Sequence, residues 1–171
     1  VYSIGQRFAN EGIVRFNATP IALTTSNYQN MKNLTLDDSM LIETLNQLYQ
    51  FEKETGIATD ILRCLPYCVL ENNDHLKQYF NKSCKAGKDN LAISPDGSLR
   101  PCVVLSESYG NIFETNFNDI PQIMGNNYSR THLDECNGCS LEKTCSGGCE
   151  EDVRNRKLCK DEIDYKPICH K

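Results

Sequence analysis

Ten cysteines are the residues of this 171-residue chain whose type and spacing most clearly offer chemistry. They make up about 6% of the chain, several times ordinary usage, and six of them fall in the last 36 residues. Cys136 and Cys139 are separated by two residues, so a tight turn can direct both sulfurs at one centre. Thiolates are soft ligands, and four of them arranged tetrahedrally suit zinc or an iron–sulfur cluster. The cysteines therefore predict either metal chemistry or a disulfide framework.

Three interpretations of the cysteines compete. A secreted disulfide protein is favoured by four Asn-x-Ser/Thr sequons, at Asn17, Asn33, Asn81 and Asn127. However, a chain this rich in asparagine contains about two sequons by chance, and its cysteine-poor first half needs no disulfides. Structural zinc sites usually contain paired C-x2-C turns, of which this chain has one. Iron–sulfur binding agrees best with the spacing.

Composition argues against two classes of protein. No run of apolar residues approaches the roughly 18 that a membrane-spanning helix needs, so we expect no integral membrane protein. Lys and Arg are scattered through a chain of net charge −5, unlike the basic surface of a nucleic-acid-binding protein. We therefore expect a cytoplasmic protein without membrane or nucleic-acid partners.

The first half of the chain has the pattern of an α/β layer. Val1, Ile4 and Phe8 have helical spacing, and a chain that begins inside an amphipathic helix leads us to expect the C-terminal piece of a larger protein. A natural N-terminal helix is the alternative. The further elements expected are a strand over 13–21, a helix over 37–55 and a strand over 57–70 interrupted by Pro66. This order predicts parallel strands in an α/β layer or barrel.

The second half has a different sequence pattern, with short strand-like runs followed by a cysteine-rich end. Two strand-like runs, 91–94 and 99–105, flank the turn residues Pro95-Asp96-Gly97 and predict a β-hairpin. A short helix is expected over 118–124. The cysteine-rich end beyond it has almost no apolar periodicity, so something bound must order it. We therefore expect two domains, residues 1–74 and 75–171.

The cysteine spacing of the second half resembles that of the SPASM domain. This domain is the C-terminal extension of many radical S-adenosylmethionine (SAM) enzymes that modify peptides and proteins. The similar residues span about 84–169: Cys84-x12-Gly97-x4-Cys102, Gly110-Asn111-Ile112, Cys136-x2-Cys139-x5-Cys145-Ser146-Gly147-Gly148-Cys149 and a final Cys169. The segment Leu91 to Cys102, including Ser94-Pro95-Asp96-Gly97, is similar as well.

The resemblance implies two auxiliary 4Fe-4S clusters with interleaved ligands. Cys84, Cys102 and Cys149 would bind the first cluster, and Cys136, Cys139, Cys145 and Cys169 would bind the second. The segment Leu65-Pro66-Tyr67-Cys68 resembles the family's segment at the barrel end, so Cys68 is preferred over Cys64 as the fourth ligand of the first cluster. Some family members leave that position open for substrate. Cys169 is preferred over Cys159 because residues 164–169 resemble the closing segment of the family, which leaves Cys159 as a free thiol.

Residues 1–74 would then be the closing strands and helices of the partial (β/α) barrel that holds SAM. An irregular α+β SPASM domain with a β-hairpin would follow. The family's initiating cluster needs C-x3-C-x2-C, which this chain lacks. Cys64 and Cys68 have the first spacing, but Glu71 occupies the place of the third cysteine. The chain alone is thus expected not to start radical chemistry. Asn17 or Thr19, near the end of the first strand, would contact SAM or face solvent.

Two classes of function follow from the resemblance. The first is the cluster-bearing part of a peptide- or protein-modifying enzyme, in which a radical derived from SAM takes a hydrogen atom from a substrate residue. Its partners would be a peptide or protein substrate and an electron donor such as flavodoxin or ferredoxin. The context Pro66-Tyr67-Cys68 weakly favours peptide maturation. The second class is a non-catalytic binding or electron-transfer module.

The remaining polar residues give weaker signals. His75, His132 and His170 have no ligand-like spacing and are expected in solvated positions, although His170 could tune a cluster from beside Cys169. The acidic stretch Glu150-Glu151-Asp152 is expected to be the solvated face of a short helix, with binding of a basic leader peptide as the alternative. No Ser/His/Asp set and no phosphate loop is present.

Overall fold

Helix α3 (Asp38–Thr55) organises the first half of the molecule. The side chain of Asp37 caps it by accepting a hydrogen bond from the Met40 N–H at 2.8 Å, and Gly56 follows its end, close to the predicted bounds 37–55. Its buried residues share one face: Leu41, Leu45, Leu48 and Phe51. The structure is a computed structural model and describes residues 1–24, 27–70, 72–145 and 147–158.

Two short parallel strands accompany this helix. β1 (Arg15–Ala18) pairs with β2 (Ala58–Ile61), so that Arg15 lies opposite Ala58 and Ala18 lies opposite Ile61. α3 lies in the connection between them, as parallel strands require a crossover. The predicted mixed α/β arrangement is confirmed, but both strands are shorter than expected. A two-stranded sheet is not a barrel, so the partial SAM barrel stays a prediction.

Helix α1 (Tyr2–Ala9) packs closely against α3. A Cβ atom added to Gly5 would lie 2.8 Å from the Phe51 ring, so only glycine permits this approach. The Phe51 ring also makes edge contacts with Tyr2 and Phe16, with ring centroids 6.4 and 5.3 Å apart. The core beneath these elements is one apolar cluster: Leu41, Leu45, Leu48, Ile61, Leu65, Val69, Leu70, Leu76, Tyr79 and Phe80.

The second half contains the predicted hairpin in a shorter form. β3 (Ala92–Ile93) pairs antiparallel with β4 (Leu99–Arg100), and Gly97 turns the chain with φ of 85°. β4 stops before Pro101, which has no N–H to donate to a ladder. Helix α4 (Ile120–Asn127) follows the short 3-10 helix η4 (Phe117–Asp119), where the sequence predicted one helix over 118–124.

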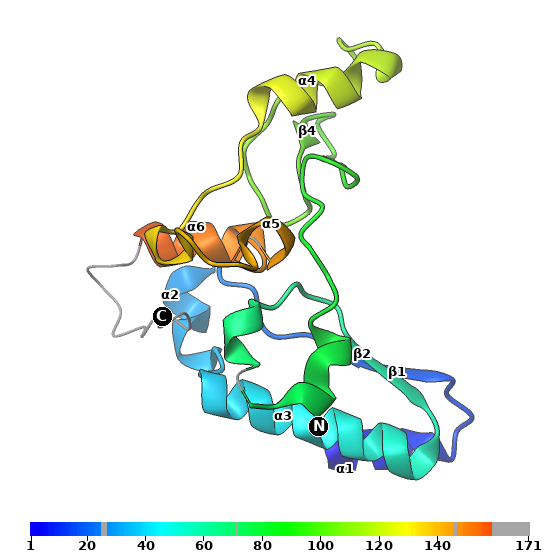
Figure 1. The fold of residues 1–171 in the computed structure, drawn as a ribbon. Coiled ribbons are helices and arrows are strands. Elements are labelled where there is room, and N and C mark those ends of the chain that lie inside the picture. The colour runs from blue at the N-terminus through cyan, green and yellow to red at the C-terminus, as the bar shows by residue number, and fades with distance from the viewer. Residues whose placement is uncertain (25–26, 71, 146, 159–171) are drawn as a thin grey trace.

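Figure 1 shows the arrangement of the elements. The hairpin and α4 lie at one end of the molecule, α1 and α3 lie at the other, and α5 (Glu142–Cys145) and α6 (Glu150–Leu158) lie between them. The remaining short helices are α2 (Tyr28–Met31), η1 (Lys32–Leu34), η2 (Tyr67–Val69), η3 (Asp74–Tyr79) and η5 (Asp134–Cys136). Within the described residues, no helix is long and apolar enough to cross a membrane.

Candidate metal centre

Eight of the ten cysteines lie in the described residues, and all eight are thiols rather than disulfides. Two of them are buried, Cys136 and Cys145, and six are half-buried: Cys64, Cys68, Cys84, Cys102, Cys139 and Cys149. The predicted ligand Cys169 and its alternative Cys159 lie outside the described residues. Partial burial suits metal ligands, because a cluster must be shielded from water and still be reached by an electron partner.

Cys64, Cys84 and Cys149 come together in space although they are far apart in the sequence. Burial raises the pKa of the Cys64 thiol to about 11, and the neighbouring Cys84 and Cys149 add to the rise. Negative charge on Cys84 or Cys149 is therefore felt at Cys64, which indicates that both of these residues lie near Cys64. The charge of Arg130 acts in the opposite direction and lowers the pKa of Cys64.

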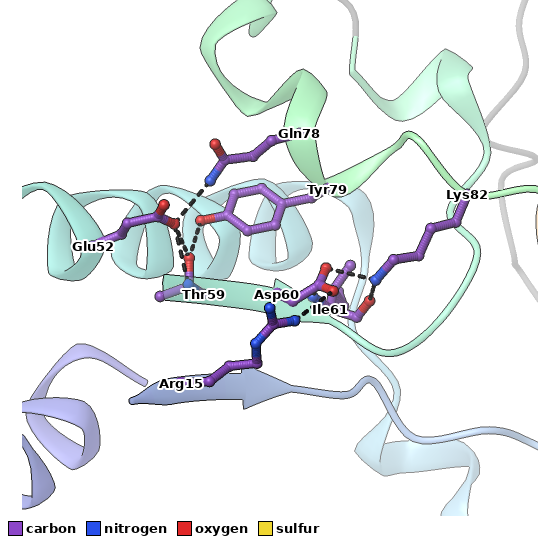
Figure 2. Close-up of polar contacts among 8 residues, drawn as sticks. All are labelled: Arg15, Glu52, Thr59, Asp60, Ile61, Gln78, Tyr79 and Lys82. Carbon is purple, nitrogen blue, oxygen red and sulfur yellow. Dashed lines mark hydrogen bonds and ion pairs between the residues drawn. The ribbon is translucent and has the colours of Figure 1, made fainter. Parts of the chain in front are cut away.

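The end of strand β2 positions Cys84. Figure 2 shows the Lys82 ammonium donating to the Asp60 carboxylate and to the Ile61 carbonyl, both at 2.5 Å. Because Asp60 and Ile61 end β2, this anchor holds the chain two residues before Cys84 against the strand end. Cys64 follows the same strand end after three residues.

A second group of polar contacts in Figure 2 fixes the helical turns that lead to Lys82. The hydroxyl groups of Thr59 and Tyr79 lie 2.7 Å apart, and Thr59 also donates to the Glu52 carboxylate at 2.5 Å. Gln78 donates to the same carboxylate at 3.0 Å. These contacts join α3, β2 and η3, so the position of Cys84 depends on the well-packed first half of the molecule.

A close backbone approach brings Cys149 to the same place. A Cβ atom on Gly148 would lie 2.9 Å from the Pro66 nitrogen and 3.1 Å from the Cys64 carbonyl oxygen. Gly148 also has φ of +92°, a conformation that favours glycine. Gly148 thus lets the residue before Cys149 pack directly against the segment that carries Cys64.

The start of α6 sets the electrostatic environment of Cys149. Burial and the nearby Asp152 raise the pKa of this thiol, whereas Arg63 and the backbone N–H groups of Asp152 and Glu151 lower it. A helix N-terminus with free N–H groups is a favourable place for a thiolate. Arg63 is buried and pairs with Asp152, so it also ties the segment after β2 to α6.

Cys136 and Cys145 form a second locality. Cys136 packs with Leu133 and Val153, and a Cβ atom on Gly147 would lie 3.8 Å from the Cys136 sulfur. The backbone N–H of Tyr67 donates to the Cys145 sulfur at 3.3 Å. The tight turn predicted between Cys136 and Cys139 is present, since the Cys139 N–H donates to the Cys136 carbonyl at 3.1 Å.

The other predicted ligands among the described residues are Cys68, Cys102 and Cys139. Cys68 lies in η2, one residue after Tyr67, and is therefore next to the locality of Cys145. Cys102 follows β4 and Cys139 follows the turn after η5. Across residues 1–24, 27–70, 72–145 and 147–158, no three His, Cys, Asp or Glu side chains are arranged to hold a single metal ion.

The other polar residues singled out from the sequence have ordinary surroundings. His75 is exposed, 2.7 Å from the Asn46 carboxamide oxygen, and His132 is exposed, 2.8 Å from that of Asn137. Asn17 and Thr19 are exposed at the end of β1, as their solvent-facing alternative expects. His170 and Glu71 lie outside the described residues.

The expectation of a solvated acidic face on the last helix is wrong. Glu150 and Glu151 are 1% and 7% exposed, because α6 turns its first residues inwards. Arg130 and Arg154 compensate the charge of Glu150, at 3.3 and 2.8 Å. Arg130 could not be found from the sequence because it comes from another segment and has no helical spacing with Glu150, whereas Arg154 lies four residues after Glu150 in the same helix, a spacing that could have indicated the pair.

Comparison with known proteins gives one family. Residues 84–150 match the model of the SPASM family, an iron-sulfur cluster-binding domain. The predicted resemblance is confirmed over this segment, which contains six of the cysteines described above. No curated protein and no solved structure matches the chain.

Proposed function

We propose, from the SPASM match over residues 84–150, that this chain is the cluster-binding C-terminal portion of a radical SAM enzyme that modifies peptides or proteins. In this proposal it holds two auxiliary 4Fe-4S clusters. The observation that carries it is the SPASM match over six cysteines, and the approach of Cys84 and of the Gly148-Cys149 segment to Cys64 supports it. Thiol groups meeting in a half-buried site are the donor set that an iron–sulfur cluster needs.

The first cluster would be held by Cys84, Cys102 and Cys149. Cys68 was preferred as its fourth ligand from the sequence, with Cys64 as the alternative. The structure favours Cys64, because Gly148 packs on the Cys64 backbone and Lys82 holds the Cys84 segment beside the same strand end. The pKa of about 11 keeps the Cys64 thiol protonated until a metal displaces the proton, so loading should release protons.

The second cluster would be held by Cys136, Cys139 and Cys145, with Cys169 as the proposed fourth ligand. The Tyr67 N–H already donates to the sulfur of Cys145, a ligand of this cluster. At the first cluster, the N–H groups of Glu151 and Asp152 act in the same way on the Cys149 sulfur. Such hydrogen bonds to ligand sulfurs stabilise negative charge and raise the reduction potential. Residues 64–67 therefore touch both localities, which supports electron transfer between them.

Bound clusters would supply one-electron transfer or a binding site for substrate. The residues of this chain would hold them, exclude water and set their potentials. The chain lacks C-x3-C-x2-C, so cleavage of SAM would require residues beyond it. A peptide or protein substrate, and an electron donor such as flavodoxin or ferredoxin, are the partners we propose.

Metal analysis of the anaerobically reconstituted chain tests the proposal. We expect about eight irons per chain and two 4Fe-4S signals in electron paramagnetic resonance of the reduced protein. Cys84→Ala and Cys136→Ala should each remove a different signal. One zinc per chain without iron would overturn the proposal.

A matched pair of variants separates the two candidates for the fourth ligand. Cys64→Ser should weaken or alter the signal that Cys84→Ala removes, because serine is a poor substitute for a thiolate ligand. Cys68→Ser should leave that signal unchanged. The reverse result would restore Cys68 as the ligand, and two unchanged signals would indicate an open position on the first cluster.

A further inference from the structure

Arg130 joins the two segments that carry Cys84 and Cys149. Its guanidinium donates to the Cys84 carbonyl oxygen at 3.3 Å and to the Gly148 carbonyl oxygen at 3.0 Å. The side chain is 16% exposed, so these bonds compete little with water. One planar group thus spans the backbone of one proposed ligand and the residue directly before another.

Glu150 holds the guanidinium in place. Its carboxylate lies 3.3 Å from the Arg130 Nε and accepts hydrogen bonds from the Thr131 N–H at 2.9 Å and from the Arg154 Nε at 2.8 Å. Arg154 in turn pairs with Glu107. A carboxylate only 1% exposed is costly to bury without such partners, and apolar residues of similar size are often as stable. The network therefore calls for a role beyond stability.

We infer that Arg130 is a positioning residue for the first cluster: it fixes the Cys84 and Cys149 segments relative to each other and places a permanent positive charge beside the cluster. This inference rests on the proposed function. Arginine suits the task because its rigid fork donates to two acceptors at once, whereas lysine offers a single point charge. A neighbouring positive charge favours the reduced cluster, which carries one more electron, and so raises its potential.

The effect can be measured on the first cluster alone. In the full chain carrying Cys136→Ala, which should remove the second cluster, we would compare Arg130 with Arg130→Met and Arg130→Lys. The readouts are the rate of iron loss to a chelator, the midpoint potential from a redox titration, and unfolding in urea. Arg7→Met is the control, because Arg7 is an exposed arginine of α1 in the first half of the molecule.

Arg130→Met should lose iron roughly 10- to 100-fold faster, the usual cost of removing a residue that orients metal ligands, and its potential should become more negative. Arg130→Lys should also lose iron faster but keep a potential close to that of the parent, because the charge remains. A Cys84→Ala chain carrying Arg130→Met should show an unchanged second-cluster potential. Arg7→Met should change neither readout.

Parent-like iron loss and potential in folded Arg130→Met would overturn the inference. Equal potential shifts in the Met and Lys variants would overturn its electrostatic part. If Arg130→Met does not fold, Arg130→Lys carries the test, and a parent-like rate of iron loss overturns the positioning role. A parent chain that binds no iron would instead overturn the proposed function, so the two failures are distinguishable.

Discussion

The two halves of the molecule are held together by different physics. The first half has one continuous apolar core under α3 and the two strands, in which Leu45, Leu48 and Ile61 are fully buried. The second half has two small clusters, one around Leu99 and one around Leu133 and Val153. Between these clusters lie thiols, glycines and the buried charges of Glu150. Apolar burial orders the first half, whereas the second half needs its polar network and a bound group.

The largest difference in behaviour between the two halves should appear when the metal is removed. Without iron, the amides of residues 84–158 should lose most of their protection against hydrogen exchange, because little apolar area holds them and the free energy of metal binding is there a free energy of folding. The amides of α3 should stay protected. Exchange followed by mass spectrometry on the loaded and chelator-treated chain measures both. Equal protection of residues 84–158 in the two samples would contradict the comparison.

A substitution in the apolar interior of the first half should instead lower the free energy of unfolding without any change in the metal. Phe51→Ala removes a fully buried ring that contacts Gly5, Phe16 and Tyr2, and should lower the free energy of unfolding by about 3–5 kcal/mol. Met40→Ala, on the exposed side of the same helix, should change it by about 0.5 kcal/mol or less. Urea unfolding measures both variants. Similar values for the two would show that α3 does not carry the core.

Glycine substitutions probe the approach between the halves. Gly148→Ala and Gly138→Ala both put a Cβ on backbone with positive φ, +92° and +75°, so both carry a similar strain. At Gly148 the Cβ also meets Pro66 at 2.9 Å, whereas at Gly138 it meets nothing within 4 Å. Gly148→Ala should therefore cost about 1–3 kcal/mol more in urea unfolding and lose iron from the first cluster. Equal costs would mean that Gly148 is not held against the segment after β2.

The same contrast explains what the sequence could predict. The helical pattern over 37–55 located α3 within a residue or two, because the spacing of its apolar residues specifies that helix locally. The spacing of the cysteines predicted a SPASM resemblance over about 84–169, which the family match confirms over 84–150, because metal ligands recur at short, fixed intervals. Both are cases in which nearby residues carry the information.

Other features depend on segments that meet only in the fold. The choice of Cys68 by likeness to a family segment stays a prediction, whereas the contact of Gly148 with the Cys64 segment and the influence of Cys84 and Cys149 on Cys64 are visible only in the fold. The burial of Glu150 was missed because Arg130, one of its two partners, lies 20 residues upstream, where no helical spacing links the two residues. The strand over 57–70 was overextended because a β-branched run does not show where its partner strand ends.

The smallest effect we expect concerns pH and Glu151. Burial raises the pKa of this carboxyl and outweighs the lowering by the Asn155 hydrogen bond and by Arg154, and the nearby charges of Glu107 and Asp152 also raise it. The folded chain therefore holds this proton more tightly than the unfolded chain, and stability falls as the pH rises through the folded-state pKa. At pH 7 the ionised carboxylate costs stability that glutamine would not.

Glu151→Gln should accordingly raise the urea midpoint at pH 7, by on the order of 1 kcal/mol or less in free energy. The gain should vanish below the usual glutamate pKa of 4.5, where the carboxyl is protonated in both states. Glu114→Gln, at an exposed position, should show little change at either pH. A loss of stability in Glu151→Gln at pH 7 would mean that this carboxylate, like that of Glu150, is compensated by the arginines around α6. The first turn of α6 would then hold two buried, compensated carboxylates, those of Glu150 and Glu151.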